Sequence, residues 1–151
     1  MVVQLARWEP DNPYFWQTEG ERVARRNLAV SVAALVLAFA VWMMWSTLAA
    51  LLPHAGFRFT TNQLFWLVAA PGLAGATLRF LFTFAVPLVG GRTWTVLSTL
   101  LLLVPTLGFA IAVRDPSTGY PTFLLLALAC GIGGGNFASS MANISFFYPA
   151  E

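Results

Sequence analysis

Arg79 is the residue whose chemistry is hardest to explain by packing alone. It is the only charged residue between Arg58 and Arg92, and it interrupts a long apolar stretch. A charge at the centre of a bilayer costs about 2.5–3.5 kcal/mol on the most lenient scale. None of the long apolar segments contains an Asp or Glu that could pair with it. The sequence therefore predicts that the guanidinium binds an anion, or alternatively that it caps the carbonyl groups of a neighbouring helix.

A planar oxyanion fits an arginine, because the guanidinium fork donates two parallel hydrogen bonds to two oxygens. An aromatic ring can pack on the flat face of such an anion, and side-chain amides can donate further hydrogen bonds. The segment around Phe137 offers both, since Asn136, Ser140 and Asn143 share a helical face beside it. We expect Arg79, Phe137, Asn136, Ser140 and Asn143 to bind substrate. Hydrogen bonding between helices is the alternative role for the three polar residues.

Composition indicates that lipid is the solvent of the elements that carry these residues. Hydrophobic residues make up 58% of the chain and charged residues only 9%, against about 25% charged in soluble domains. Each apolar segment exceeds the roughly 20 residues that cross a bilayer. These segments span residues 27–52, 62–88, 93–113 and 120–148. The sequence thus predicts an all-α membrane protein with about four transmembrane helices, preceded by an interfacial arm over residues 1–26.

Small residues indicate where the predicted helices approach one another. Gly72 and Gly75 lie two turns and one turn before Arg79, and Gly131 and Gly135 are spaced by one turn in the last segment. Such faces allow helix backbones to pack closely in membranes. Pro71 and Pro105 lie inside predicted helices and are expected to kink or loosen them.

Arginine placement predicts the orientation in the membrane. The arginines on one side are Arg7, Arg22, Arg25, Arg26 and Arg92, and those on the other side are Arg58 and Arg114. Because cytoplasmic loops carry the excess of basic residues, the N-terminus is expected in the cytoplasm. With four spans, the end of the chain returns to the same side.

Several function classes are disfavoured by the composition. The net charge of +2 is small and dispersed, which argues against nucleic-acid binding. No cluster of candidate metal ligands, nucleophile or acid–base pair indicates an enzyme, and no cofactor or metal is predicted. Cys130 is the only cysteine and lies in an apolar run, where a packed thiol is expected.

Short motifs along nearly the whole chain resemble one transporter family. They include Trp8-Glu9-Pro10, Ala24-Arg25-Arg26-Asn27-Leu28, Gly75-Ala76-Thr77-Leu78-Arg79 and Gly90-Gly91-Arg92. The most specific motif runs from Asn136 to Pro149. With these motifs the chain resembles the N-terminal part of the nitrate/nitrite porter family (NarK-type) of the major facilitator superfamily.

The resemblance implies nitrate uptake and nitrite export across a bacterial inner membrane. It matches Arg79 to an anion-binding arginine and Phe137 to a phenylalanine that packs on the anion. It also implies a 12-helix fold, so the partners of this chain would be nitrate or nitrite, the lipid bilayer, and the missing C-terminal helices with a second arginine. The alternatives are a membrane fragment without transport activity and a small self-assembling exporter.

Overall fold

The computed structural model describes residues 8–150 of the chain. Within that range every regular element is helical, and four helical stretches are long and apolar enough to cross a membrane. The predicted all-α fold with about four transmembrane helices is therefore confirmed. Arg7, which contributed to the predicted orientation, the first residues of the predicted arm and Glu151 lie outside the described residues.

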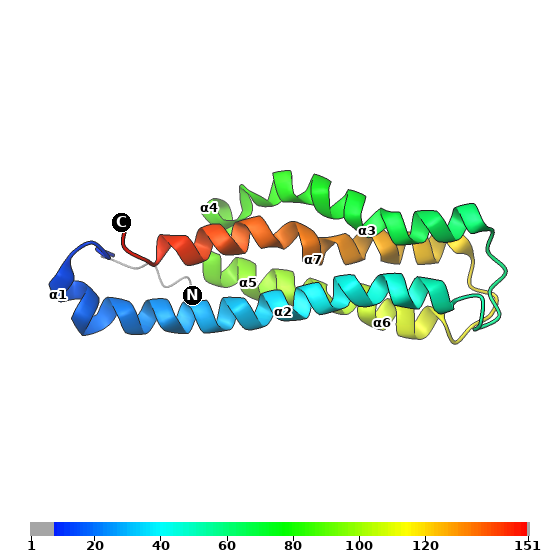
Figure 1. Cartoon of the computed structure of the whole chain (residues 1–151), viewed down its shortest axis with the longest axis horizontal. Helices are drawn as coiled ribbons and strands as arrows, with labels where there is room; N and C mark the ends of the chain where they lie inside the picture. Colours follow the sequence, from blue (N-terminus) through cyan, green and yellow to red (C-terminus); the bar gives the residue numbers. More distant parts are fainter. Residues whose placement is uncertain (1–7, 151) are drawn as a thin grey trace.

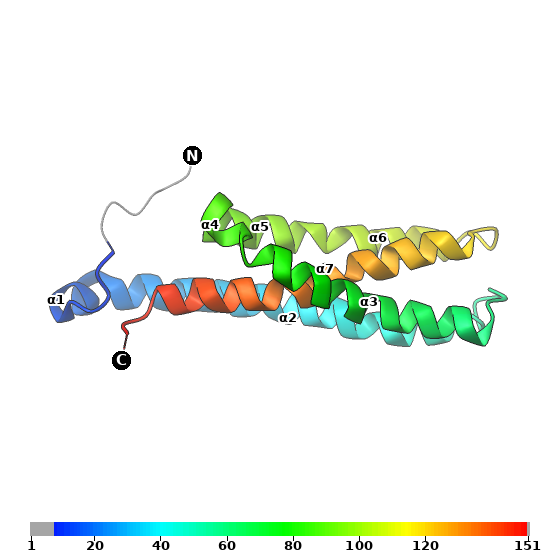
Figure 2. The ribbon, with the colours of Figure 1, turned by 90° about the horizontal axis from the view of Figure 1, so that it is seen from above.

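The last helix, α7 (Tyr120–Phe146), lies at the centre of the bundle. It packs against α2 (Glu21–Leu51), α3 (Thr61–Phe82), α5 (Gly91–Leu101) and α6 (Leu103–Ala112). Figures 1 and 2 show the long helices side by side along one axis, with α1 and the end of α7 at the same end of the bundle. A central helix must be approached from several sides, which explains why α7 is rich in glycine and serine.

From Pro13 onward the N-terminal arm is helical and continuous with the first span. Asn12 caps α1 (Pro13–Phe15), accepting hydrogen bonds from the backbone N–H groups of Tyr14 and Phe15. A π-helical turn over Trp16–Gly20 then leads directly into α2. The boundary predicted at residue 26 is thus not a break in the helix, because no glycine or proline interrupts α2.

The two prolines have different effects on their helices. Proline removes the hydrogen bond to the carbonyl four residues earlier. For Pro71 that carbonyl belongs to Leu67, and the Trp45 indole N–H of α2 donates to it over 2.9 Å, so α3 continues. Near Pro105 the predicted single helix is divided, because α5 ends at Leu101 and α6 begins at Leu103. In membranes neighbouring helices can satisfy backbone groups that a proline frees, and α2 does so for Pro71.

The start of α3 is defined by a capping box, which provides a first prediction. The Thr60 hydroxyl accepts from the Gln63 backbone N–H, and the Gln63 side chain accepts from the Thr60 N–H. Replacing Thr60 with alanine should destabilise this turn by about 0.5–2 kcal/mol. Faster hydrogen exchange of the first amides of α3 would show it. The neighbouring Thr61→Ala should have little effect, and equal exchange in both variants would contradict the assignment.

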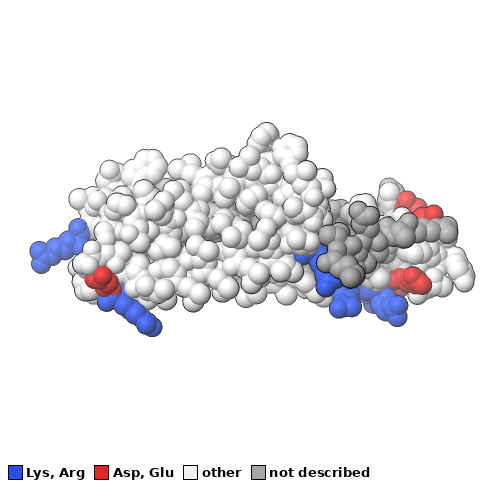
Figure 3. Space-filling model, turned by 180° about the vertical axis from the view of Figure 1, so that it is seen from behind, with Lys and Arg blue, Asp and Glu red and all other residues white. Residues whose placement is uncertain are grey.

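The largest cluster of buried hydrophobic residues lies at the end of the bundle opposite to α1. Its aromatic core there includes Trp45, Phe57, Phe109 and Phe123. Figure 3 shows that charged side chains gather at the two ends of the molecule, while the long middle of that face carries none. This distribution is what a membrane-spanning bundle requires, because charges are stable only near the interfaces.

Candidate functional site

Arg79 lies in the last turn of α3, which ends at Phe82 instead of continuing to residue 88 as predicted. After a break at residues 83 and 84, the chain forms a separate short helix, α4 (Ala85–Val89). The Arg79 side chain is exposed, and within residues 8–150 it forms no hydrogen bond or ion pair. The carbonyl-capping role considered above is therefore not seen among these residues. The negative end of the α3 dipole favours a cation here.

Arg79 nevertheless lies about halfway along the length of the bundle, because α3 ends beside the middle of α7. A Cβ built on Gly135 would lie 3.3 Å from the backbone nitrogen of Arg79. At 1.5 Å per residue, Gly135 is about 22 Å from the start of α7 and about 17 Å from its end. An unpaired guanidinium at this depth is the feature that most needs a ligand.

A seam of glycines brings α3 and α7 into backbone contact. A Cβ on Gly131 would lie 2.7 Å from both the Gly75 nitrogen and the Pro71 carbonyl oxygen. A Cβ on Gly75 would lie 3.1 Å from the Gly131 carbonyl oxygen. Gly72 differs from these glycines, because a Cβ there would meet no described atom within 4 Å. The packing expected at Gly72 is thus not formed by residues 8–150.

Gly72 instead lines a small cleft of about 190 Å³ between α2 and α3, together with Val68 and Met43. Val68, Gly72 and Arg79 share a stripe of α3, since residues four and seven positions apart lie on one helical face. On α2, Phe39 lies one turn before Met43 and packs edge-on against Phe137 at 5.7 Å. Helical periodicity therefore directs Arg79 and Phe137 to the same side of the bundle, between α2 and α3.

The structure gives Asn136 a protein partner that sequence reasoning missed. The Trp94 indole N–H of α5 donates to Asn136 Oδ1 at 2.6 Å and to Ser139 Oγ at 3.1 Å. Ser139 Oγ donates in turn to Asn136 Oδ1 at 3.0 Å. All three side chains are buried. The bond from Trp94 thus ties Asn136 Oδ1 to α5 and gives the side chain a helix-packing role, whereas its Nδ2 group, which would donate to an anion, takes no part in this network. The sequence could have indicated that Trp94 has a polar partner, because an indole N–H inside an apolar segment needs an acceptor.

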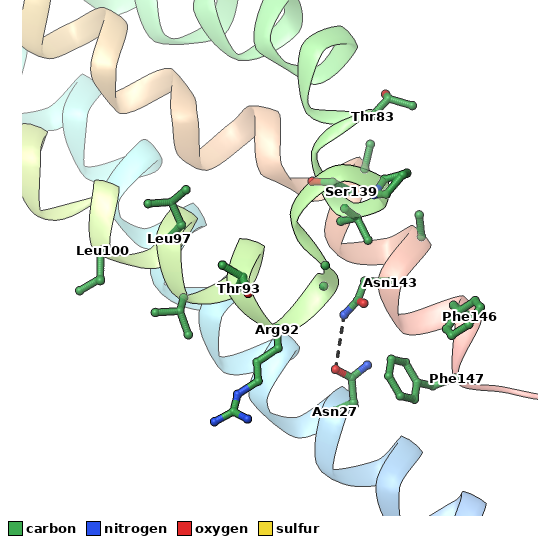
Figure 4. Close-up of a pocket in the computed structure, with 17 residues that line it drawn as sticks. Asn27, Thr83, Arg92, Thr93, Leu97, Leu100, Ser139, Asn143, Phe146 and Phe147 are labelled. Carbon is green, nitrogen blue, oxygen red and sulfur yellow. Dashed lines mark hydrogen bonds between the residues drawn. The ribbon is translucent and has the colours of Figure 1, made fainter. Parts of the chain in front are cut away.

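Asn143 lies apart from Arg79 and Phe137, in a cavity of about 1230 Å³ that residues of α2, α5 and α7 help to line (Figure 4). Its Nδ2 donates to Asn27 Oδ1 of α2 over 3.4 Å. The cavity is also lined by Arg92 and Ser139, but not by Arg79, Phe137, Asn136 or Ser140. Ser140 is buried within the bundle. The five predicted binding residues therefore do not form one cluster.

The chain is similar to known proteins along nearly its whole length. No family model matches the chain. It is 54% identical over 145 residues to the nitrate/nitrite transporter NarU of Salmonella typhimurium and 52% identical to NarU of Escherichia coli. Over this length the chain is similar to nitrate/nitrite transporters. A probable nitrate/nitrite antiporter of Thermus thermophilus, NarK2, is 45% identical over 145 residues.

These matches cover 96% of the chain but only 31–32% of each relative. The chain thus spans about a third of the length of the nitrate/nitrite transporters it matches. The family resemblance expected from the motifs is confirmed, and the chain is a multi-pass membrane protein of bacterial type.

Proposed function

We propose that the chain is part of a nitrate/nitrite transporter and supplies one side of its anion path. The observation that carries the proposal is the exposed guanidinium of Arg79. It lies about halfway along the bundle and has no partner among residues 8–150. Relatives at 45–54% identity are named for nitrate and nitrite, and both ligands are planar oxyanions suited to an arginine fork. We further propose a location in the bacterial inner membrane with a cytoplasmic N-terminus.

In this proposal Arg79 binds two oxygens of the anion and the exposed Phe137 ring packs on its face. The proposal is supported by helical periodicity, which directs both residues to the side between α2 and α3, and by the exposure of both side chains among the described residues. We place these two residues at the centre of the binding set, because Asn143 Nδ2 donates to Asn27, Ser140 is buried, and Asn136 is tied to α5 through its amide oxygen. The facing wall of the path would come from further helices, as in a 12-helix major facilitator fold built of paired repeats.

Complementation tests this function with the full chain. The chain is co-expressed with the remaining two-thirds of the Escherichia coli relative as a separate polypeptide, and the pair is reconstituted into nitrite-loaded proteoliposomes. Nitrate uptake is expected from the pair and from neither polypeptide alone, because alternating access needs two parts that rock around the site. A pair that co-purifies but exchanges neither anion would contradict the proposal. Uptake by the chain alone would support a self-assembling transporter instead.

A further inference from the structure

Trp94 of α5 contacts the helical turns on both sides of the candidate anion site without belonging to it. Its side chain is 7% exposed, and its N–H is shared between Asn136 and Ser139 of α7. Asn136 immediately precedes Phe137 in α7. The indole N–H therefore fixes the turn of α7 from which the Phe137 ring projects.

The ring of Trp94 contacts the other helix of the site. It packs edge-on against Phe82, with the ring centroids 4.8 Å apart. Phe82 is the last residue of α3 and lies in the same turn as Arg79. Beyond Phe82 the helix breaks, so no continuing helical turn supports the end that carries Arg79.

Close packing supports the same two turns from the other direction. A Cβ on Gly135 would lie 3.0 Å from Leu78 Cβ and 3.2 Å from the Gly75 carbonyl oxygen. The glycine seam thus sets how near α3 comes to α7. These glycine contacts extend no further along α3 than Arg79, so the turn that ends at Phe82 relies on other contacts. Trp94 supplies the missing constraint through its contacts with Phe82 and Asn136.

We propose that Trp94 is a positioning residue that holds Arg79 and Phe137 in register for one anion. The inference rests on the proposed function for the roles of those two residues, but the positioning itself is a property of the bundle. Trp94 does not contact the ligand. Its removal should weaken anion binding because the two ligand-contacting turns lose their common support.

A fluorine probe tests the positioning without any transport. The full chain is labelled with 4-fluorophenylalanine at position 137, and its ¹⁹F NMR spectrum is recorded in detergent. Trp94→Phe keeps an aromatic ring against Phe82 but removes the N–H donor, so the ¹⁹F resonance should shift or broaden. Trp45→Phe is the matched control, because it also removes a buried indole donor, at the far end of the bundle. It should leave the resonance unchanged.

Transport kinetics then test the consequence in the complemented pair. The net strength of one buried hydrogen bond corresponds to roughly a fivefold to tenfold change in an equilibrium constant. Trp94→Phe should raise the KM for nitrate by about that factor and change the maximal rate by less than about twofold. Trp45→Phe should lower thermal stability without changing KM.

The outcomes separate this inference from the proposed function. An unchanged ¹⁹F resonance in folded Trp94→Phe would overturn the positioning role, whatever the pair transports. A shifted resonance with no nitrate transport by the wild-type pair would retain it and refute the proposed function. If Trp94→Phe fails to fold, Ser139→Ala loosens the same network more mildly and should shift the resonance in the same direction. No shift there would also overturn the inference.

Discussion

Replacing Arg79 with alanine is expected to reduce nitrate transport by the complemented pair by about 30-fold to several thousand-fold. The estimate follows from the roughly 2–5 kcal/mol lost when one partner of a buried, hydrogen-bonded charge pair is truncated. The guanidinium forms no bond to residues 8–150, so its removal should leave the bundle folded. Nitrate uptake, measured together with the amount of assembled pair in the proteoliposomes, separates lost binding from lost protein.

Two further variants test whether charge or geometry matters at this position. Arg79→Lys keeps the positive charge but cannot donate two parallel hydrogen bonds, so it should fall between wild type and Arg79→Ala. Arg114→Ala removes an exposed arginine beyond the end of α6 and should transport normally. Robust uptake by Arg79→Ala would exclude Arg79 as the anion ligand.

Replacing Gly131 with alanine is expected to separate α3 from α7. The added Cβ would lie 2.6 Å from the Ala74 Cβ and 2.7 Å from two backbone atoms of α3, and backbone cannot move aside as a side chain can. Overpacking of this kind costs about 1–3 kcal/mol, which corresponds to a fall in melting temperature of about 3–10 °C. Labelling of Cys130 measures this fall in melting temperature, because the single buried thiol reacts with a maleimide dye only when the bundle opens.

Gly72→Ala is the matched control for the glycine seam. It lies on the same helix as Gly75, but its Cβ would enter open space. Alanine is favoured over glycine inside a helix by about 0.8–1 kcal/mol, so the melting temperature should stay the same or rise. If Gly72→Ala and Gly131→Ala lowered the melting temperature equally, close packing at the seam could not explain the loss.

Much of the fold follows from the sequence because the bilayer simplifies the problem. Lipid cannot hydrogen-bond to the backbone, so a long apolar segment must become a helix. The four spans of the described chain therefore follow from apolar length alone. Their ends were less predictable. The break after Phe82 lies within the apolar segment predicted over residues 62–88, and residues 13–26 are helical and lead directly into the first span although they are polar.

The candidate site was only partly predictable, for a different reason. Arg79 is conspicuous in the sequence because a charge in an apolar segment has an intrinsic cost. The polar residues of α7 are ambiguous, because an amide at membrane depth can serve a ligand or a neighbouring helix equally well. Which of the two it serves depends on what lies opposite. For Asn136 that is Trp94, a residue far away in the sequence.

The amino-acid sequence alone thus established an all-α membrane protein with an uncompensated arginine and a resemblance to nitrate/nitrite porters. Each of these rests on a property of single residues or short segments, such as hydrophobicity, charge or motif identity. Pairings between helices depend on rotation and depth, which no local pattern specifies. Tertiary packing therefore determined that Gly131 meets Gly75 while Gly72 stays open. It also determined that Trp94 donates a hydrogen bond to Asn136, and that Arg79 and Phe137 are directed to the same side of the bundle.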